Sequence, residues 1–194
     1  MRCLAGNAIV GLTTILFMSS LAGAESQPEH DAVSGFHDHL LEMARLDSQI
    51  EREKFVDAAV ADLFDVERIT KVSVGRTWRT LDEAVRLNLI EVVGDLIVGT
   101  YARRFDADRG QKFQVLDTER VRRGIVVRTE IKPKGGEAVS LDYFFQNGKV
   151  FNVAADGVSD LSLRRADYGS VVKSDGIEGL MSHLESKLQE MRAE

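Results

Sequence analysis

His37, Asp38 and His39 form the closest group of metal-ligand types in the 194-residue sequence. Helical zinc sites commonly use two histidines four residues apart, which share one face of the helix. These two histidines lie two residues apart, so on a helix their side chains point in different directions. Cys3, the only cysteine, lies far away at the N-terminus. The sequence therefore predicts no metal site, and this group is interpreted as solvated helix residues.

Recognised catalytic motifs are also missing. The sequence has no Gly-x-Ser-x-Gly nucleophile elbow, no phosphate-binding glycine loop and no dinucleotide fingerprint. A carboxyl group whose pKa is raised in an apolar pocket can act as an acid or a base. Asp142 or Asp156 could do so in an enzyme built on a cone-shaped α+β fold, but the sequence places no second polar group beside either. We therefore expect no enzyme and no cofactor, and keep this enzyme as the alternative.

Two arginine clusters remain. Arg120, Arg122 and Arg123 lie at a strand junction, and Arg164 and Arg165 lie on a helix near the C-terminus. Charged clusters usually serve solubility, so the simpler interpretation is solvated surface. The alternative is a docking patch for a lipid headgroup or an acidic partner.

The N-terminus has the features of a secretory signal. Met1 and Arg2 precede an uncharged, mostly apolar run from Leu4 to Leu21, and Ala22-Gly23-Ala24 offers a signal peptidase site. We expect a cleaved signal peptide at residues 1–24 and a single domain at residues 25–194 in a Gram-negative periplasm; a signal anchor is the alternative. Removal of residues 1–24 takes away one arginine and changes the net charge from −6 to −7, which disfavours a nucleic-acid partner.

The first part of the remaining chain is predicted to be helical, because apolar residues recur every three or four positions in residues 33–44 and 55–63. Asp65 is the expected N-cap of a helix that stops at Gly75. Thr80 and Glu83 are expected to form a capping box that opens a long helix.

Strands follow, because apolar and polar residues alternate between Lys112 and Ala155. Three or four antiparallel strands are expected, the first at Lys112–Thr118. Asn147-Gly148 is a strong hairpin signal. A two-residue turn there pairs Phe145 with Val150, Tyr143 with Asn152, and Leu141 with Ala154, and leaves Phe144, Phe151 and Val153 on the other face. A short amphipathic helix and a final helix with an apolar stripe complete an α+β fold.

The long helix contains the segment LNLIEVVGDLIVGTYARRF, residues 87–105, which is too apolar for an ordinary surface helix. On a helical wheel, one narrow sector holds its polar or small residues Asn88, Glu91, Asp95, Gly99 and Ala102. Apolar residues cover roughly two-thirds of the circumference, about twice the stripe that a surface helix needs. This helix is expected to meet helices on one side and, on the other, the sheet or something between it and the sheet. A central helix in a close-packed core is the alternative.

Six segments, taken in order, resemble the toluene-tolerance, MlaC-type periplasmic lipid-binding proteins: GFHDHLL, FDVERITKVSVGRTWRT, TYARRFD, VVRTEI, SLDYFF and KVFNVAADGVSDLSLRRADY. Within that family, YARRFD and GVSDLSLRRADY are more similar to the branch associated with hopanoid biosynthesis. The resemblance covers nearly all of residues 25–194. It implies a soluble carrier without enzymatic activity, in which a curved antiparallel sheet and helices enclose an apolar cavity for lipid tails.

The resemblance also implies the cargo and the partners: a phospholipid or a hopanoid, passed between an outer-membrane lipoprotein complex and an inner-membrane ABC transporter with a substrate-binding hexamer. The candidate lipid-binding residues are inward-facing residues of the long helix and the sheet, namely Val93, Ile97, Tyr101, Val127, Ile131, Leu141, Tyr143, Phe145 and Val150. Each of them could instead belong to the packed core. A protein-interaction module that binds no lipid remains a further alternative.

Overall fold

The structure, a computed structural model, describes residues 27–107 and 110–193, so the expected signal peptide at residues 1–24 lies outside the described residues. Its elements follow the order helices, strands, helix: α1 (Pro28–Met43), α2 (Gln49–Leu63), α3 (Val66–Val74), the 3-10 helix η1 (Gly75–Thr80), α4 (Glu83–Arg104), β1 (Lys112–Val121), β2 (Gly124–Lys132), β3 (Val139–Gln146), β4 (Lys149–Ala155), β5 (Val158–Ser159) and α5 (Asp160–Ala193). The α+β class is confirmed. None of the helices in the described ranges is long and apolar enough to cross a membrane.

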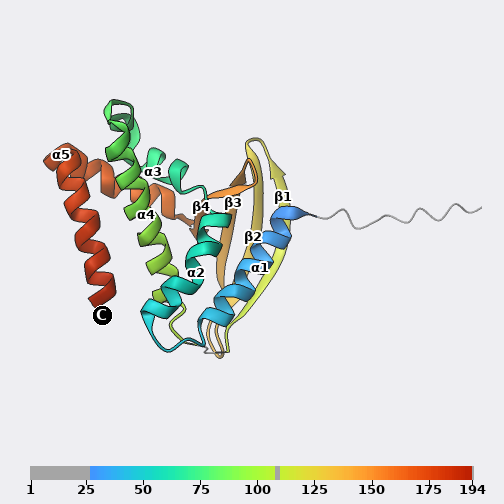
Figure 1. Cartoon of the computed structure of the whole chain (residues 1–194). Coiled ribbons are helices and arrows are strands. Elements are labelled where there is room, and N and C mark those ends of the chain that lie inside the picture. Colours follow the sequence, from blue (N-terminus) through green and yellow to red (C-terminus); the bar gives the residue numbers. More distant parts are fainter. Residues whose placement is uncertain (1–26, 108–109, 194) are drawn as a thin grey trace, which may run out of the picture.

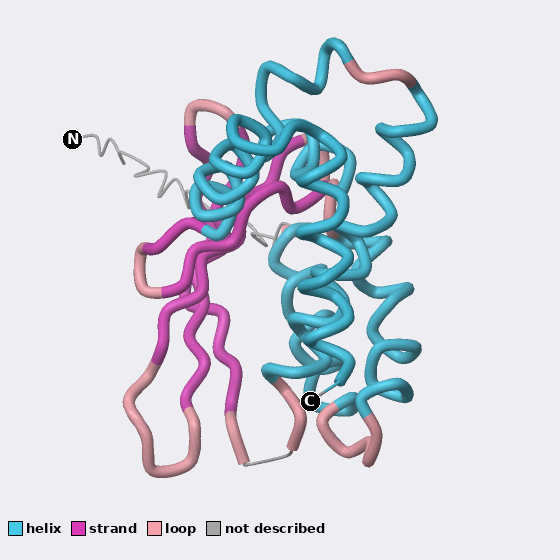
Figure 2. The backbone as a smooth tube through the Cα atoms, turned by 90° about the vertical axis from the view of Figure 1, so that its left-hand side faces the viewer, coloured by secondary structure: helices cyan, strands magenta, loops and turns pink. Residues whose placement is uncertain are grey.

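The five strands form one open antiparallel sheet in sequence order, from β1 at one edge to β5 at the other. Most of the helices lie on one side of this sheet (Figure 2). Helix α4 packs against α2, α3 and α5, and the last part of α5 lies on the side of α4 that faces away from the sheet (Figure 1). The sheet has five strands instead of the expected three or four; β5 was missed because it has only two residues and carries no alternation that a sequence could display.

Aspartates cap the first turns of α3 and α4. Asp65 caps α3 as expected, since its carboxylate accepts a hydrogen bond from the Arg68 amide at 3.0 Å. The expected capping box at Thr80 is wrong, because α4 begins after Asp82, whose carboxylate accepts from the Val85 amide at 2.9 Å. The Thr80 hydroxyl instead donates to the Thr77 carbonyl inside η1. The preceding 3-10 turn thus takes up the residue that would have been the cap.

The β3–β4 hairpin follows the expected register for only one of the three predicted pairs. Phe145 lies opposite Val150, but Tyr143 lies opposite Val153 rather than Asn152, and Leu141 opposite Ala155 rather than Ala154. A bulge at Phe151 inserts one residue into β4 and shifts every later pair. Because paired residues share a face, Val153 lies on the face of Tyr143, which corrects the expectation that it faces away.

The narrow sector of α4 that holds its polar and small residues is only partly exposed to solvent. Asn88 and Glu91 are exposed, whereas Gly99 and Ala102 are buried. Gly99 leaves room for Met191 of α5, whose sulfur would lie 2.5 Å from a Cβ placed there. The Ala102 carbonyl accepts a hydrogen bond at 2.9 Å from the buried Arg52 guanidinium. The two small residues thus serve close helix contacts.

Helix α5 consists of two helical pieces joined at Gly176, whose φ of 72° and ψ of −164° interrupt the helix. The break confirms the expected short amphipathic helix followed by a final helix. Of the predicted apolar stripe, Leu180, Leu184 and Leu188 are buried in the core. The first piece follows β5 directly and leads away from the sheet, and the second piece turns and lies beside α4 (Figure 1).

Candidate functional site

A cavity of about 470 Å³ separates α4 from the sheet. Its walls are mostly apolar and come from α4, the residue that follows α2, helix α3, strands β2 to β5, and the first turns of α5. The lining residues shared among these elements are Phe64, Ile69, Ile97, Thr100, Tyr101, Arg104, Phe105, Ile131, Val139, Leu141, Tyr143, Phe151, Asn152, Val153, Ala155, Val158, Asp160, Leu161, Leu163 and Arg164. The second apolar side of α4 therefore faces a cavity that lies between this helix and the sheet.

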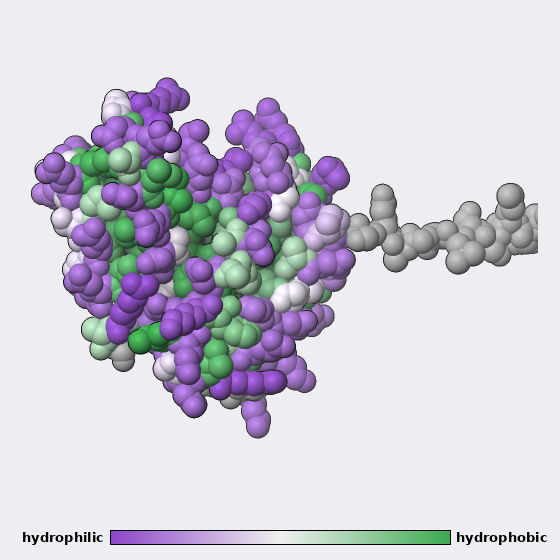
Figure 3. All heavy atoms as spheres, in the orientation of Figure 1, coloured by the Kyte–Doolittle hydropathy of each residue, from purple (hydrophilic) through white to green (hydrophobic). Residues whose placement is uncertain are grey.

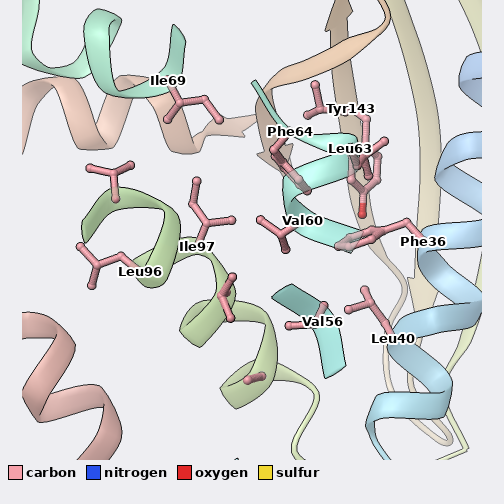
Figure 4. Packing of buried hydrophobic residues seen from close by; sticks show 14 of the residues in the cluster. Phe36, Leu40, Val56, Val60, Leu63, Phe64, Ile69, Leu96, Ile97 and Tyr143 are labelled. Carbon is pink, nitrogen blue, oxygen red and sulfur yellow. The ribbon is translucent and has the colours of Figure 1, made fainter. Parts of the chain in front are cut away.

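The helices and strands around the cavity point their apolar side chains into it. Ile97 on α4, Ile69 on α3 and Phe64 after α2 point into the space between these elements (Figure 4). On β3, the alternation of side chains along the strand brings Val139, Leu141 and Tyr143 to the same face. The bulge in β4 adds Val153 to that face, opposite Tyr143.

Five of the nine candidate lipid-binding residues line this cavity: Ile97, Tyr101, Ile131, Leu141 and Tyr143. The other four lie in the packed hydrophobic core: Val93, Val127, Phe145 and Val150. Val93 lies one helical turn before Ile97, at a depth where α4 contacts protein rather than the cavity. For all nine, lipid contact itself stays a prediction.

Sequence reasoning missed most of the residues at the rim. Val158 and Leu163 line the cavity, yet their side chains are 54% and 59% exposed. Large apolar residues in a polar context can indicate such a rim, but Val158 follows a turn and Leu163 lies between Ser162 and Arg164, on a segment read only as a short amphipathic helix. Apolar patches between polar ones are also visible over α4 and α5 (Figure 3). These two exposed side chains give the cavity an apolar mouth.

Two tyrosines of the cavity wall, Tyr101 and Tyr143, form a polar cluster with a histidine that lies behind Tyr143 and does not itself line the cavity. His37 on α1 is 3% exposed, and its Nε2 lies 3.0 Å from the Tyr143 hydroxyl. Its ring stacks on Phe113 with 4.1 Å between ring centroids. Burial raises the pKa of Tyr143 and of Tyr101, whose hydroxyls interact with each other. The expectation that His37 is solvated is therefore wrong, because its face of α1 packs on the sheet.

Burial also makes stability depend on pH. The pKa of His37 falls from 6.5 to about 4, since desolvation penalises the imidazolium. Between these values the unfolded chain binds a proton that the folded protein excludes, so the free energy of unfolding decreases as the pH falls. We expect a loss of about 3 kcal/mol from this group between pH 6.5 and pH 4, measured by urea unfolding. The free energy of unfolding of the variant His37→Phe should fall by correspondingly less over the same pH range. If its pH dependence equalled that of the wild type, His37 would not be the group responsible.

Arg164 is the least exposed of the charged residues in the cavity wall, which also include Arg104 and Asp160. Its Nε donates to the Asp160 carboxylate at 2.6 Å, and its Nη1 donates to the Tyr168 hydroxyl at 3.3 Å. Burial alone would lower the pKa of Arg164, but Asp160 and Tyr168 raise it above its ordinary value, so the guanidinium stays charged. The cavity wall thus contains a charged guanidinium that an acid and a phenol hold in place.

The remaining sequence candidates lie elsewhere. Asp142 falls between two cavity-lining residues of β3, so its side chain is on the other face of the sheet. Asp156 is exposed in the β4–β5 turn, where its carboxylate accepts a hydrogen bond from the Ser140 amide at 2.9 Å. Arg165 donates to the Val72 carbonyl. Arg120, Arg122 and Arg123 are exposed around the β1–β2 turn. Within the described ranges, no cluster of three or more His, Cys, Asp or Glu residues could hold a metal ion.

Comparison with known proteins gives a family and a fold. A family model described as MlaC protein matches residues 37–186. A solved structure of the phospholipid-binding protein from Ralstonia solanacearum, in complex with a phospholipid, is similar to this chain with a TM-score of 0.74 and 21% sequence identity. The match covers 84% of this chain and 98% of that chain. At this identity the structural similarity shows a shared fold.

Proposed function

The chain belongs to the MlaC protein family, and on that premise we propose that residues 25–194 form a soluble periplasmic carrier that shuttles lipid between membranes. Family membership, together with the fold shared with a phospholipid-binding protein, supports a lipid-binding role. The observation that carries the proposal is the apolar cavity between α4 and the sheet, with its exposed apolar mouth at Val158 and Leu163. Export with cleavage after Ala24 is part of the proposal.

The cavity volume fits an acyl chain. An apolar cavity of about 150 Å³ holds one benzene ring of six carbons. By that ratio, 470 Å³ takes up about 15 to 20 carbons, or one ordinary acyl chain. The second chain of a phospholipid then extends over the mouth, where Val158 and Leu163 offer apolar surface. A rigid polycyclic hopanoid would need a wider space than one flexible chain, so a phospholipid is the cargo that we propose.

The energetics suit a shuttle. Each methylene exposed to water costs about 0.8 kcal/mol, so two free tails would cost on the order of 20 kcal/mol. The chain inside the cavity regains its share of that free energy, and the chain over the mouth regains part of its own on the apolar surface there. The free energy of transfer from the membrane is then well below the cost of two free tails, which allows both loading and unloading.

This role needs no catalytic group. The positions of Asp142 and Asp156 outside the cavity wall support a binding role over the alternative enzyme. We propose as partners an inner-membrane ABC transporter with a substrate-binding hexamer and an outer-membrane lipoprotein complex, as the family resemblance implies. These partners would load and empty the carrier.

A transfer experiment tests the proposal. Donor vesicles contain a self-quenched fluorescent phospholipid, acceptor vesicles contain none, and residues 25–194 are added at increasing concentration. We expect the rate of dequenching to rise in proportion to the protein concentration, because each molecule carries lipid through water. A rate equal to that of vesicles alone at every protein concentration would contradict the carrier.

A further inference from the structure

A second hollow, which we call the polar groove, adjoins the mouth of the cavity. It lies between α4 and the two pieces of α5 and has a volume of about 570 Å³. Four residues line both the groove and the cavity: Thr100, Asp160, Leu163 and Arg164. These shared side chains separate the two hollows, so a ligand in the cavity can extend past them into the groove.

The groove has balanced charge. Its three cations are Arg103, Arg164 and Lys187, and its three anions are Asp160, Asp167 and Glu190. Several of these groups are fixed by contacts with each other. Lys187 lies 2.6 Å from the Asp167 carboxylate, which His183 also contacts at 3.4 Å. The lining cations and anions are equal in number, so no single sign of charge dominates the groove.

We propose that the polar groove binds the headgroup of the carried lipid, and that it selects a zwitterionic phosphodiester that carries an ammonium group. This inference rests on the proposed function, because the acyl chain in the cavity brings the headgroup to the groove. The phosphate lies near Arg164, which Asp160 and Tyr168 hold in place at the junction of the two hollows. The ammonium lies near Glu190, which lines the groove but not the cavity.

Charge complementarity carries the choice of headgroup. A phosphate alone would meet three carboxylates as well as three cations, and the carboxylates would repel it. A headgroup with both signs can pair each of its charges with an opposite charge of the wall. Because Arg164 is already fixed, little side-chain entropy is lost when the phosphate binds.

The test measures headgroup preference in the folded carrier. Residues 25–194 are stripped of lipid, incubated with vesicles that contain equal amounts of phosphatidylethanolamine and phosphatidylglycerol with identical acyl chains, and reisolated. The bound lipids are extracted and their ratio is measured by mass spectrometry. We expect phosphatidylethanolamine to be enriched about threefold, the effect of one well-placed charge contact.

Two variants that change the net charge equally show where the preference arises. Glu190→Lys makes the groove net positive, so phosphatidylglycerol should become the preferred lipid. Glu185→Lys is the control, because Glu185 is an exposed residue of the same helix that does not line the groove. The control should keep the preference for phosphatidylethanolamine.

The outcomes separate this inference from the proposed function. Bound lipid without headgroup preference, or an equal shift in both variants, overturns the groove assignment and leaves the carrier intact. A protein that takes up neither lipid overturns the carrier itself. Glycerophosphoethanolamine, the free headgroup, is expected to bind far more weakly than the whole lipid. If it binds as tightly, the groove is a site for a small soluble phosphodiester and the headgroup assignment fails.

Discussion

Replacement of Ile97 by arginine is expected to give a folded protein that carries almost no lipid. Ile97 is 4% exposed and lines the cavity from α4, so an arginine there extends into free volume rather than into packed atoms. A charge without a partner in an apolar site costs several kcal/mol, enough to lower bound lipid to less than about a tenth of the wild-type amount. Bound lipid is measured by extraction and mass spectrometry, and the fold by circular dichroism.

Ile97→Met is the matched control. It keeps the volume and the apolar character of the side chain, so it should bind lipid normally and lose less than about 1.5 kcal/mol of stability. Wild-type lipid content in Ile97→Arg would mean that this face of α4 does not contact the lipid.

The same substitution one helical turn earlier is expected to unfold the protein. Val93 is fully buried in the hydrophobic core and does not line the cavity. Val93→Arg would force a guanidinium among packed apolar atoms, and an unpaired buried charge costs about 4 kcal/mol or more, most of the stability of a typical domain. Urea unfolding followed by circular dichroism should show a midpoint far below that of Ile97→Arg, or no folded baseline.

These two substitutions together distinguish cavity from core on one helix. If Val93→Arg were as stable as Ile97→Arg and also lost its lipid, Val93 would have to line the cavity, and α4 would be turned about its axis relative to the structure. If both variants unfolded, there would be no free volume beside Ile97.

Sequence patterns predicted the elements well because each is set by local interactions. The aspartate cap of α3, the Asn147-Gly148 turn and the apolar stripe of the final helix depend on neighbours within a few residues. The two-sided burial of α4 was also visible, because helical periodicity records how much of the circumference is apolar. These patterns were sufficient for the α+β class.

The cavity itself could not be separated from the core by sequence. Val93 and Ile97 are both apolar, buried and one turn apart, and only the three-dimensional packing distinguishes them. The bulge at Phe151 has no local signal either, although it decides which residues of β4 face the cavity. The burial of His37 depends on a contact with Tyr143, which lies 106 residues away. Contacts between residues far apart in the chain produce no pattern that a single sequence displays.

The central claim is that the cavity between α4 and the sheet holds a lipid, and the contents of the purified protein test it most directly. Residues 25–194 are exported with the native signal, purified without detergent, extracted with organic solvent and analysed by mass spectrometry. We predict about one phospholipid per protein molecule. Stoichiometric hopanoid would keep the carrier but change its cargo. A protein that is empty on purification, and still empty after incubation with phospholipid vesicles, would contradict the claim.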